Sequence, residues 1–138
     1  MEKRELIYEG KAKMVFATDE PGQVIHEFKD EATAFDGKKR GTVAGKGRTN
    51  AQMSDIIFRY LEKKGVHTHH IKLISDTEIA TWWLEMFKIE IIVRNYAAGS
   101  LAKRLGYSDR TQMKTPLVEF YYKSDELGDP MLSREHIH

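Results

Sequence analysis

The sequence predicts an α+β fold, in which a small antiparallel sheet is covered by a helix. Short apolar runs separated by turn residues occupy the first 30 positions, as is typical of strands. From Asn50 the hydrophobic period changes to that of a helix, and strand-like runs return after it. A sheet with a covering helix implies the α+β class.

Size and composition limit the possibilities. A chain of 138 residues, 41% of them hydrophobic, can bury one core with room for a small subdomain, but not two independent domains. Because 22 basic residues nearly balance 21 acidic ones, the net charge is only +1 and does not favour binding to nucleic acid. There are no cysteines, no signal peptide at the charged amino terminus and no apolar run of membrane length. We expect a soluble, cytoplasmic protein with neither nucleic acid nor membrane as a partner.

The first predicted elements form a meander. Residues 6–8 and 14–17 are strand candidates on either side of a Gly-Lys segment, and Pro21-Gly22 is a strong turn signal before a third strand at 24–28. Consecutive strands joined by such short connections predict antiparallel pairing.

The predicted helix follows Asn50 and ends at Gly65. Its apolar residues recur at i, i+3, i+4, i+7 and i+8, which places them on one helical face. They are Met53, Ile56, Ile57, Tyr60 and Leu61. We expect this face to cover the sheet.

The later part of the chain predicts more sheet and a short helix. The expected strands are 71–74, 78–83, 89–94 and, after Pro116, 117–122, with a helix at 101–105. The apolar run within 89–94 predicts a buried, central strand. Ser133 is a good N-cap for a helix that starts only about one turn before the last residue, so we expect an incomplete second domain.

A first candidate binding site is formed by Gly10, Lys11, Ala12 and Lys13. Glycine lets the backbone approach a ligand, and lysines at i and i+2 of a strand project to the same face. Two ammonium groups on one face suit a polyphosphate. The alternative is a solvated hairpin that carries a lysine pair, and this pattern by itself favours that alternative.

A second candidate site runs from Arg94 to Gly99 and Ser100. The arginine ends the predicted buried strand, and the Gly-Ser pair opens the short helix. Guanidinium forks and free N–H groups at helix amino termini both favour anions, which predicts an anion pocket. Alternatively, Ser100 caps the helix and Arg94 pairs with a carboxylate, and the spacing does not decide between the two.

A third candidate site is the segment 121–130, where a strand runs into a charged loop that contains Lys123 and Asp129. Here a lysine could meet a carboxylate and an aspartate an ammonium group, as a zwitterionic ligand requires. A charged surface turn is the commoner meaning of such a segment. A histidine metal site at His67, His69 and His70 is a weaker hypothesis, because no third ligand of matching geometry is evident and the other histidine pair lies at the end of the chain.

Taken in order along the chain, these segments resemble SAICAR synthetases. The resemblance covers essentially all 138 residues, and its most specific stretch is residues 90–106. The matching segments are residues 8–13, 28–37, 45–47 with Asn50, 65–69, 90–100, 103–106 and 123–130.

The resemblance implies an ATP-dependent ligase that forms a carbon-nitrogen amide bond. It would join L-aspartate to 5-amino-1-(5-phosphoribosyl)imidazole-4-carboxylate, giving SAICAR, ADP and phosphate in de novo purine biosynthesis, with Mg²⁺ bridging the ATP phosphates. Residues 1–84 would form an amino-terminal sheet domain. Residues 85–138 would form the hinge and the beginning of a larger domain that closes on ATP in a kinase-like or ATP-grasp-like clamp. A homodimer is compatible with this family.

Residue roles are carried over from the family position by position. Gly10, Lys11, Ala12 and Lys13 would contact the ATP phosphates. Glu85 and Met86 would lie in the hinge, next to the adenine. The ribotide would be bound by Arg94, Gly99 and Ser100, together with Asp36, which would order the nearby loop. Lys123 and Asp129 would form the catalytic site for aspartate. No metal ligand is implied within this stretch.

Two departures from the family bear on activity. Lys88 stands where family members usually carry proline, which predicts a looser or differently shaped hinge. The sequence also ends before the family's Asp-x-Lys-x-Glu-Phe-Gly segment and a later acidic motif, which supply magnesium ligands. We therefore expect these 138 residues by themselves not to turn over. The alternative function is a non-catalytic nucleotide-binding module.

Overall fold

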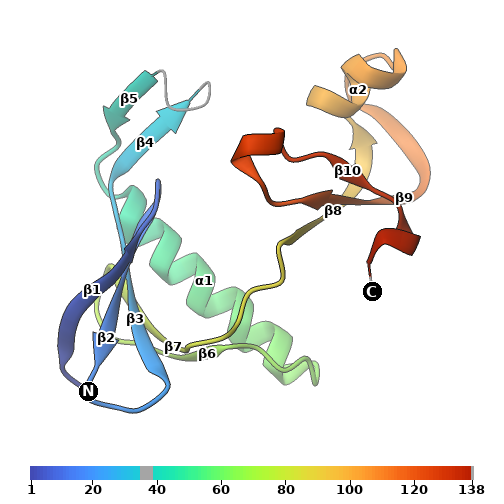
Figure 1. Ribbon diagram of the computed structural model, residues 1–138. Helices are drawn as coiled ribbons and strands as arrows, with labels where there is room; N and C mark the ends of the chain where they lie inside the picture. Colours follow the sequence, from blue (N-terminus) through green and yellow to red (C-terminus); the bar gives the residue numbers. More distant parts are fainter. Residues whose placement is uncertain (35–38, 138) are drawn as a thin grey trace. The chain divides into compact units, whose positions relative to one another are not determined.

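The computed structural model describes residues 1–34 and 39–137, and the chain divides into two compact units, Met1–Glu85 and Met86–His138 (Figure 1). Both units combine strands with a helix, so the α+β prediction is confirmed. The proposed clamp concerns how two domains meet, and it remains a prediction. Neither helix of the described chain has the length and apolarity needed to cross a membrane.

The first unit is built on a five-stranded antiparallel sheet in the order β1-β2-β3-β7-β6 (Figure 1). Its strands are β1 (Lys3–Glu9), β2 (Lys13–Thr18), β3 (Gln23–Phe28), β6 (His70–Leu73) and β7 (Glu78–Trp82). The predicted meander is confirmed, because β1 pairs with β2 and β2 with β3. Its buried centre is formed by β2, β3 and β7, with Val15, Val24, Ile25, Ile79, Ala80 and Thr81.

A separate hairpin, β4 (Glu31–Ala34) with β5 (Lys39–Thr42), was not predicted. Its two strands have four residues each and contain no large apolar residue, so they lack the usual composition of a strand. The two strands pair only with each other, and backbone hydrogen bonds hold this pairing. Asp36 lies between them, outside the described residues.

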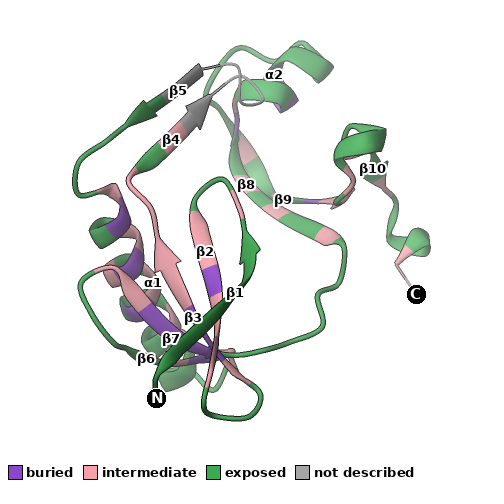
Figure 2. Ribbon diagram, turned by 60° about the vertical axis from the view of Figure 1, so that its left-hand side comes forward, coloured by how far each residue is buried: buried purple, intermediate pink, exposed green. Residues whose placement is uncertain are grey.

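Helix α1 (Lys46–Lys63) packs against β3, β6 and β7, but not through the predicted face. Its buried residues are Gly47, Ala51 and Asp55, spaced by four, whereas Met53, Ile56, Ile57 and Tyr60 are 49–60% exposed (Figure 2). The small residues Gly47 and Ala51 determine which face of the helix packs on the sheet, because they let the helix approach it closely. A Cβ atom added at Gly47 would lie 2.4 Å from the carbonyl oxygen of Phe28.

The start of α1 is fixed by a residue from another element. The Asp30 carboxylate accepts hydrogen bonds from the backbone N–H groups of Gly47 (2.8 Å) and Gly45 (3.1 Å). The bond from Gly47, followed by that from Gly45, lowers the pKa of Asp30. Because Asp30 satisfies donors of the first turn, the helix begins four residues earlier than Asn50.

The second unit contains a three-stranded antiparallel sheet in the order β10-β9-β8, together with helix α2 (Figure 1). Its elements are β8 (Ile89–Ala97), α2 (Gly99–Leu105), β9 (Thr111–Tyr122), β10 (Met131–Leu132) and 3₁₀ turns at Asp125–Leu127 and Arg134–His136. The prediction of a buried central strand at 89–94 is wrong. β8 is an edge strand, and its Ile91 and Val93 side chains are 63% and 61% exposed.

Strand β9 runs through Pro116 instead of starting after it. Arg94 pairs with Leu117 and Tyr96 with Gln112, so the register shifts between these two pairs. A proline is tolerated at such an irregularity because its missing N–H group need not join the ladder. The predicted helical turn after Ser133 is confirmed as one 3₁₀ turn with a capping box.

Candidate anion-binding sites

The turn between β1 and β2 lines a cleft of about 680 Å³ in the first unit. The backbone N–H of Gly10 donates to the carbonyl oxygen of Lys13 (2.9 Å), which closes the turn. The residues that line the cleft are Tyr8, Glu9, Gly10, Lys11, Lys29, Glu31, Ala32, Gly41 and Thr42. A Cβ atom at Gly10 would lie 3.1 Å from the Tyr8 ring, so glycine keeps this wall open.

The acidic residues of the cleft are already paired. The Lys29 ammonium lies 2.7 Å from a Glu9 carboxylate oxygen and 3.0 Å from one of Glu31. These hydrogen bonds raise the pKa of Lys29. Lys11 is thus the cation of the cleft that no carboxylate of the described chain holds in an ion pair.

Lys11 and Lys13 do not lie on one strand, as the sequence prediction assumed. Lys11 lies in the bend, whereas Lys13 is the first residue of β2 and is half-buried. The Lys13 ammonium lies 3.2 Å from Nδ1 of His26, and Nε2 of His26 lies 3.4 Å from the Thr81 hydroxyl. Desolvation, then the charges of Lys13 and His69, lower the pKa of His26 to about 4. The neutral ring therefore accepts from Lys13 at Nδ1.

The other histidines of this region pack against aromatic and acidic side chains. His69 makes an edge-on contact with Phe58 (4.9 Å between centroids). Nε2 of His70 is buried 3.2 Å from an Asp55 oxygen, without a hydrogen bond between them. Throughout the described ranges, no group of three or more His, Asp or Glu side chains is arranged to hold a metal ion. The geometry does not favour the histidine metal hypothesis.

In the second unit, Arg94 belongs to a triad with Glu119 and Arg104. Nε of Arg94 donates to one oxygen of Glu119 (2.6 Å), and Nη2 of Arg104 donates to the other. Glu119 is only 2% exposed. Although desolvation acts in the opposite direction, hydrogen bonds from both arginines hold the pKa of Glu119 below its usual range. The alternative in which Arg94 pairs with a carboxylate is therefore correct, but a second guanidinium shares that carboxylate.

Ser100 completes this cluster without capping the helix. The N-cap position of α2 is Ala98, and the Ser100 hydroxyl lies 3.5 Å from Nη2 of Arg94. Gly99 adopts the left-handed conformation (φ 56°), which favours glycine at this position.

Lys123 and Asp129 are also brought together. The Lys123 ammonium lies 3.1 Å from a Glu90 oxygen and 4.0 Å from an Asp129 oxygen. The hydrogen bond to Glu90, followed by the charge of Asp129, raises the pKa of Lys123. The other Asp129 oxygen accepts from the backbone N–H of Ser124 (2.8 Å), which fixes the loop.

The register of β8 and β9 explains this grouping. Arg94 pairs with Leu117 and Ile92 with Glu119, so residues of one sheet face alternate along both strands. On that face lie Glu90, Ile92 and Arg94 of β8 and Leu117, Glu119 and Tyr121 of β9. Ile91, Val93, Val118 and Phe120 point to the opposite face. Of the predicted ribotide and aspartate residues, Arg94 lies on this face, whereas Gly99 and Ser100 belong to α2 and Lys123 and Asp129 to the loop after β9.

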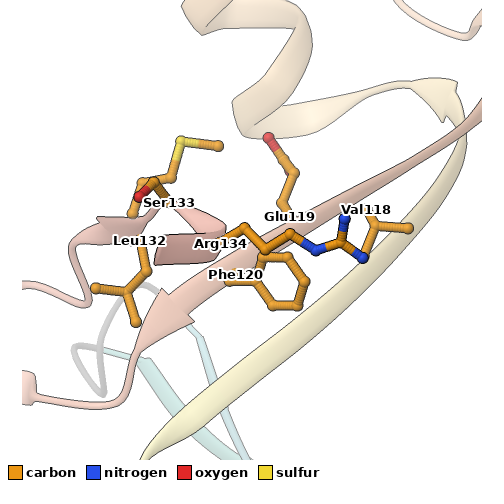
Figure 3. A pocket seen from close by; sticks show the side chains of 7 residues that line it. Val118, Glu119, Phe120, Leu132, Ser133 and Arg134 are labelled. Carbon is orange, nitrogen blue, oxygen red and sulfur yellow. The ribbon is translucent and has the colours of Figure 1, made fainter. Parts of the chain in front are cut away.

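A second cavity, of about 500 Å³, lies beside β9 and β10 and was not predicted (Figure 3). It is lined by Val118, Glu119, Phe120, Met131, Leu132, Ser133 and Arg134. In Figure 3 the Glu119 side chain points towards α2, away from Phe120. Glu85 and Met86 lie elsewhere, in the irregular segment 83–88, where Met86 is 81% exposed.

Local sequence patterns did not indicate Glu119, Arg104 and His26 as site residues, and they gave no role to Tyr121. A charged residue within the apolar run 117–120 is a usable signal, because alternation places Glu119 and Tyr121 on one face. His26, likewise a polar residue within an apolar strand, offers the same signal. Nothing local in the sequence indicates that Arg104 reaches Glu119 across 15 residues.

The fold and these clusters define an α+β protein with cationic and acidic side chains grouped at the β1–β2 turn and around β8, α2 and β9. The family model for SAICAR synthetase matches residues 6–138. The chain belongs to the SAICAR synthetase family.

Similar proteins carry related names. The chain is 53% identical over 137 residues to a phosphoribosylaminoimidazole-succinocarboxamide synthase of Coprothermobacter proteolyticus and 55% identical to one of a Thermoanaerobacter species, in each case covering 99% of this chain and 58% of the relative. The chain thus spans somewhat more than half the length of these relatives.

Solved structures agree with the fold. The synthase of Ehrlichia chaffeensis superposes with a TM-score of 0.93 at 47% identity, over 96% of this chain and 56% of that one. A SAICAR synthetase in complex with ADP gives a TM-score of 0.89 at 46% identity, with the same coverage.

Proposed function

We propose that this chain supplies the amino-terminal part of an ATP-dependent ligase that joins L-aspartate to a carboxylated aminoimidazole ribotide. The observation that carries the proposal is the similarity of 99% of the chain, at 53–55% identity, to enzymes named for this synthesis. The side-chain clusters described above give each substrate a chemically suitable partner.

The turn at residues 10–13 would bind the ATP phosphates. Lys11 lines the cleft, and Lys13 contacts a neutral imidazole instead of a carboxylate. Its positive charge is therefore not cancelled by an ion pair, and a phosphate would provide the missing counter-charge. The complex of a similar synthetase with ADP supports nucleotide use. Glu85 and Met86 would contact the adenine.

Magnesium would accompany ATP by neutralising its phosphates. The described residues do not themselves form a fitting site, because no cluster of three or more Asp, Glu or His side chains is arranged for a metal. We therefore assign no magnesium ligand and no reaction step to a metal within these residues.

The ribotide would bind at Arg94, Gly99 and Ser100, and Asp36 would order the nearby loop. Arg94 uses Nε for Glu119, which leaves its terminal nitrogens, next to the Ser100 hydroxyl, for an anionic group. Aspartate would bind at Lys123 and Asp129. These side chains lie 4.0 Å apart and are only partly buried, so one can meet the substrate carboxylate and the other its ammonium group.

The chemistry would proceed by carboxylate activation. An oxygen of the ribotide carboxylate attacks the γ-phosphorus of ATP, forming an acyl phosphate and releasing ADP. The amine of aspartate, having lost a proton, then attacks the acyl carbon, forms the amide and expels inorganic phosphate. The contribution of this chain would be to position charged groups and stabilise them, with no covalent protein intermediate.

The direct test incubates the gene product that contains these residues with ATP, L-aspartate and the carboxylated ribotide. Chromatography should show ADP and SAICAR appearing in equal amounts, and neither should form when aspartate or the ribotide is omitted. Nucleotide binding without product would instead favour the non-catalytic nucleotide-binding module.

We also propose that the protein works in the cytoplasm as a homodimer and acts on small molecules, without a nucleic-acid partner. The near balance of 22 basic and 21 acidic residues supports the last point. Sedimentation equilibrium of the gene product should give twice the chain mass, and a monomer at micromolar concentration would argue against the dimer.

A further inference from the structure

We propose that His26 is a positioning residue for nucleotide binding, which holds the Lys13 ammonium group in place for the phosphates without cancelling its charge. The inference rests on the proposed function, which gives Lys13 to the phosphates of ATP. It adds His26 to that site and explains how a lysine can be fixed in position and still remain available to an anion.

Strand register brings Lys13 and His26 together. In the sheet of the first unit, β2, β3 and β7 are neighbours (Figure 1). Val15 of β2 is paired with His26 of β3, so Lys13, two residues before Val15, lies on the same sheet face as a diagonal neighbour. Thr81 of β7, which is paired with Val24, lies on this face as well. A long side chain spans such a diagonal, and the Lys13 ammonium lies 3.2 Å from Nδ1 of His26.

The other ring nitrogen of His26 also has a partner. Nε2 lies 3.4 Å from the hydroxyl oxygen of Thr81, a residue that is completely buried. An ammonium group can only donate, so Nδ1 is the acceptor of the neutral ring and Nε2 carries the hydrogen. The Thr81 hydroxyl oxygen then accepts from Nε2. The imidazole ring is thus held at both nitrogens, and its acceptor faces Lys13.

The surroundings of His26 keep its ring neutral at physiological pH. Burial, followed by the charges of Lys13 and His69, lowers the pKa of His26 to about 4. The ring centroid of His69 lies 6.0 Å from that of His26, and burial first of all lowers the pKa of His69 as well. At neutral pH neither imidazole therefore adds a positive charge that would repel the Lys13 ammonium.

Lys29 shows the opposite arrangement in the same unit. Its ammonium lies 2.7 Å from a Glu9 oxygen and 3.0 Å from a Glu31 oxygen, and these hydrogen bonds raise its pKa. Burial instead lowers the pKa of Lys13, and no carboxylate in the part of the chain that the structure describes forms an ion pair with it. Because Lys13 donates to one neutral acceptor, its charge and its other N–H donors remain for a phosphate.

The test measures ADP binding to variants of the gene product by isothermal titration calorimetry. His26→Leu removes the acceptor and keeps a similar volume, His26→Asn keeps a neutral acceptor near the place of Nδ1, and His26→Asp puts a carboxylate there. His26→Leu is also combined with Lys13→Met. The controls are Gln23→Leu and Gln23→Asp, because Gln23 lies on the same strand but, at an odd spacing from His26, on the other face.

We expect His26→Leu to weaken ADP binding about three- to tenfold, the range for one uncharged hydrogen bond, and His26→Asn to recover most of that loss. His26→Asp should weaken binding as much as Lys13→Met does, because ADP must break the new ion pair with Lys13. In the Lys13→Met background, His26→Leu should have no further effect, since His26 acts through Lys13. Both Gln23 variants should match the wild type.

Four results would overturn the inference. They are wild-type ADP affinity in His26→Leu, wild-type affinity in His26→Asp, no better affinity in His26→Asn than in His26→Leu, and an equal loss from His26→Leu with and without Lys13. The last result would mean that His26 acts only on the fold.

Melting curves show which variants are folded, and if His26→Asp is not, the leucine, asparagine and double variants decide the matter. If Lys13→Met binds ADP as the wild type does, the assignment of Lys13 in the proposed function fails together with this inference. If Lys13→Met weakens binding and the His26 variants do not, this inference fails alone.

Discussion

The ammonium group of Lys13 lies 3.2 Å from Nδ1 of His26, so a half-buried cation at the start of β2 is held by an imidazole ring and not by a carboxylate. The ring is in turn 3.4 Å from the Thr81 hydroxyl. Burial lowers the pKa of Lys13, and burial together with Lys13 and His69 lowers that of His26 to about 4. This arrangement leads to predictions about both stability and binding.

Stability should fall when the pH drops below 6.5. The folded-state pKa values of His26 and His69 lie below the ordinary value of 6.5, so the unfolded chain takes up protons first as the pH falls. Their contribution is complete above pH 6.5 and is lost towards pH 4, the folded value of His26. Carboxylates with lowered pKa values, such as Asp30 and Glu78, lose their contribution to stability at lower pH.

Urea denaturation at pH 7.5, 6 and 5 measures this effect. The midpoint should decrease across the series, and His26→Gln should reduce the decrease. A midpoint that stays constant from pH 7.5 to 5 would show that these histidines are not held neutral in the folded protein.

Lys13→Met should separate binding from stability. The nucleotide affinity should fall by a factor of about ten to one hundred, the usual loss for one charged hydrogen bond. The melting temperature should not fall, since methionine fills a similar volume without a half-buried charge. Calorimetric titration with ADP and a melting curve test both statements. Lys72→Met on β6, at an exposed position, is the matched control, and equal ADP affinity in the two variants would contradict the role of Lys13.

Gly47→Ala should destabilise the first unit. The new Cβ atom would lie 2.4 Å from the Phe28 carbonyl oxygen, so α1 must move away from β3. Such overpacking costs about 1–3 kcal/mol. Gly41→Ala is the control, because a Cβ atom there meets nothing within 4 Å and its φ is not in the left-handed region. Urea midpoints that are equal for the two variants would mean that this close approach does not exist in solution.

Asp129→Asn should raise the KM for aspartate and leave the KM for ATP nearly unchanged. Asparagine tolerates the left-handed backbone conformation at this position (φ 48°), so the loop should persist while the negative charge is lost. Steady-state kinetics of the gene product with each substrate varied in turn is the measurement. If the KM for aspartate does not change, Asp129 only shapes the loop.

Local patterns in the sequence predicted the elements better than their faces. The period after Asn50 correctly predicted a helix, yet the helix packs through Gly47, Ala51 and Asp55 and leaves the apolar stripe outside. Hydrophobicity favours burying the stripe, but close approach to β3 requires small residues. A single sequence does not show which of these two requirements prevails.

The contacts of the site also divide into those between sequence neighbours and those set by strand register. Arg94 and Ser100 stand close in the sequence and also meet in the structure. Glu119 lies 25 residues from Arg94 and was missed, because only the register of β8 and β9 brings the two together. The pairing of Lys13 with His26 depends on register in the same way. Contacts set by strand register are therefore the part of the site that local patterns could not predict.

The most direct test of the account follows an oxygen atom from substrate to product. The gene product is incubated with ATP, L-aspartate and ribotide labelled with ¹⁸O in its carboxylate, and the released inorganic phosphate is analysed by mass spectrometry. Activation of the carboxylate by ATP predicts one ¹⁸O atom in each phosphate that accompanies an amide product. Unlabelled phosphate, or no amide product at all, would contradict the proposed ligase.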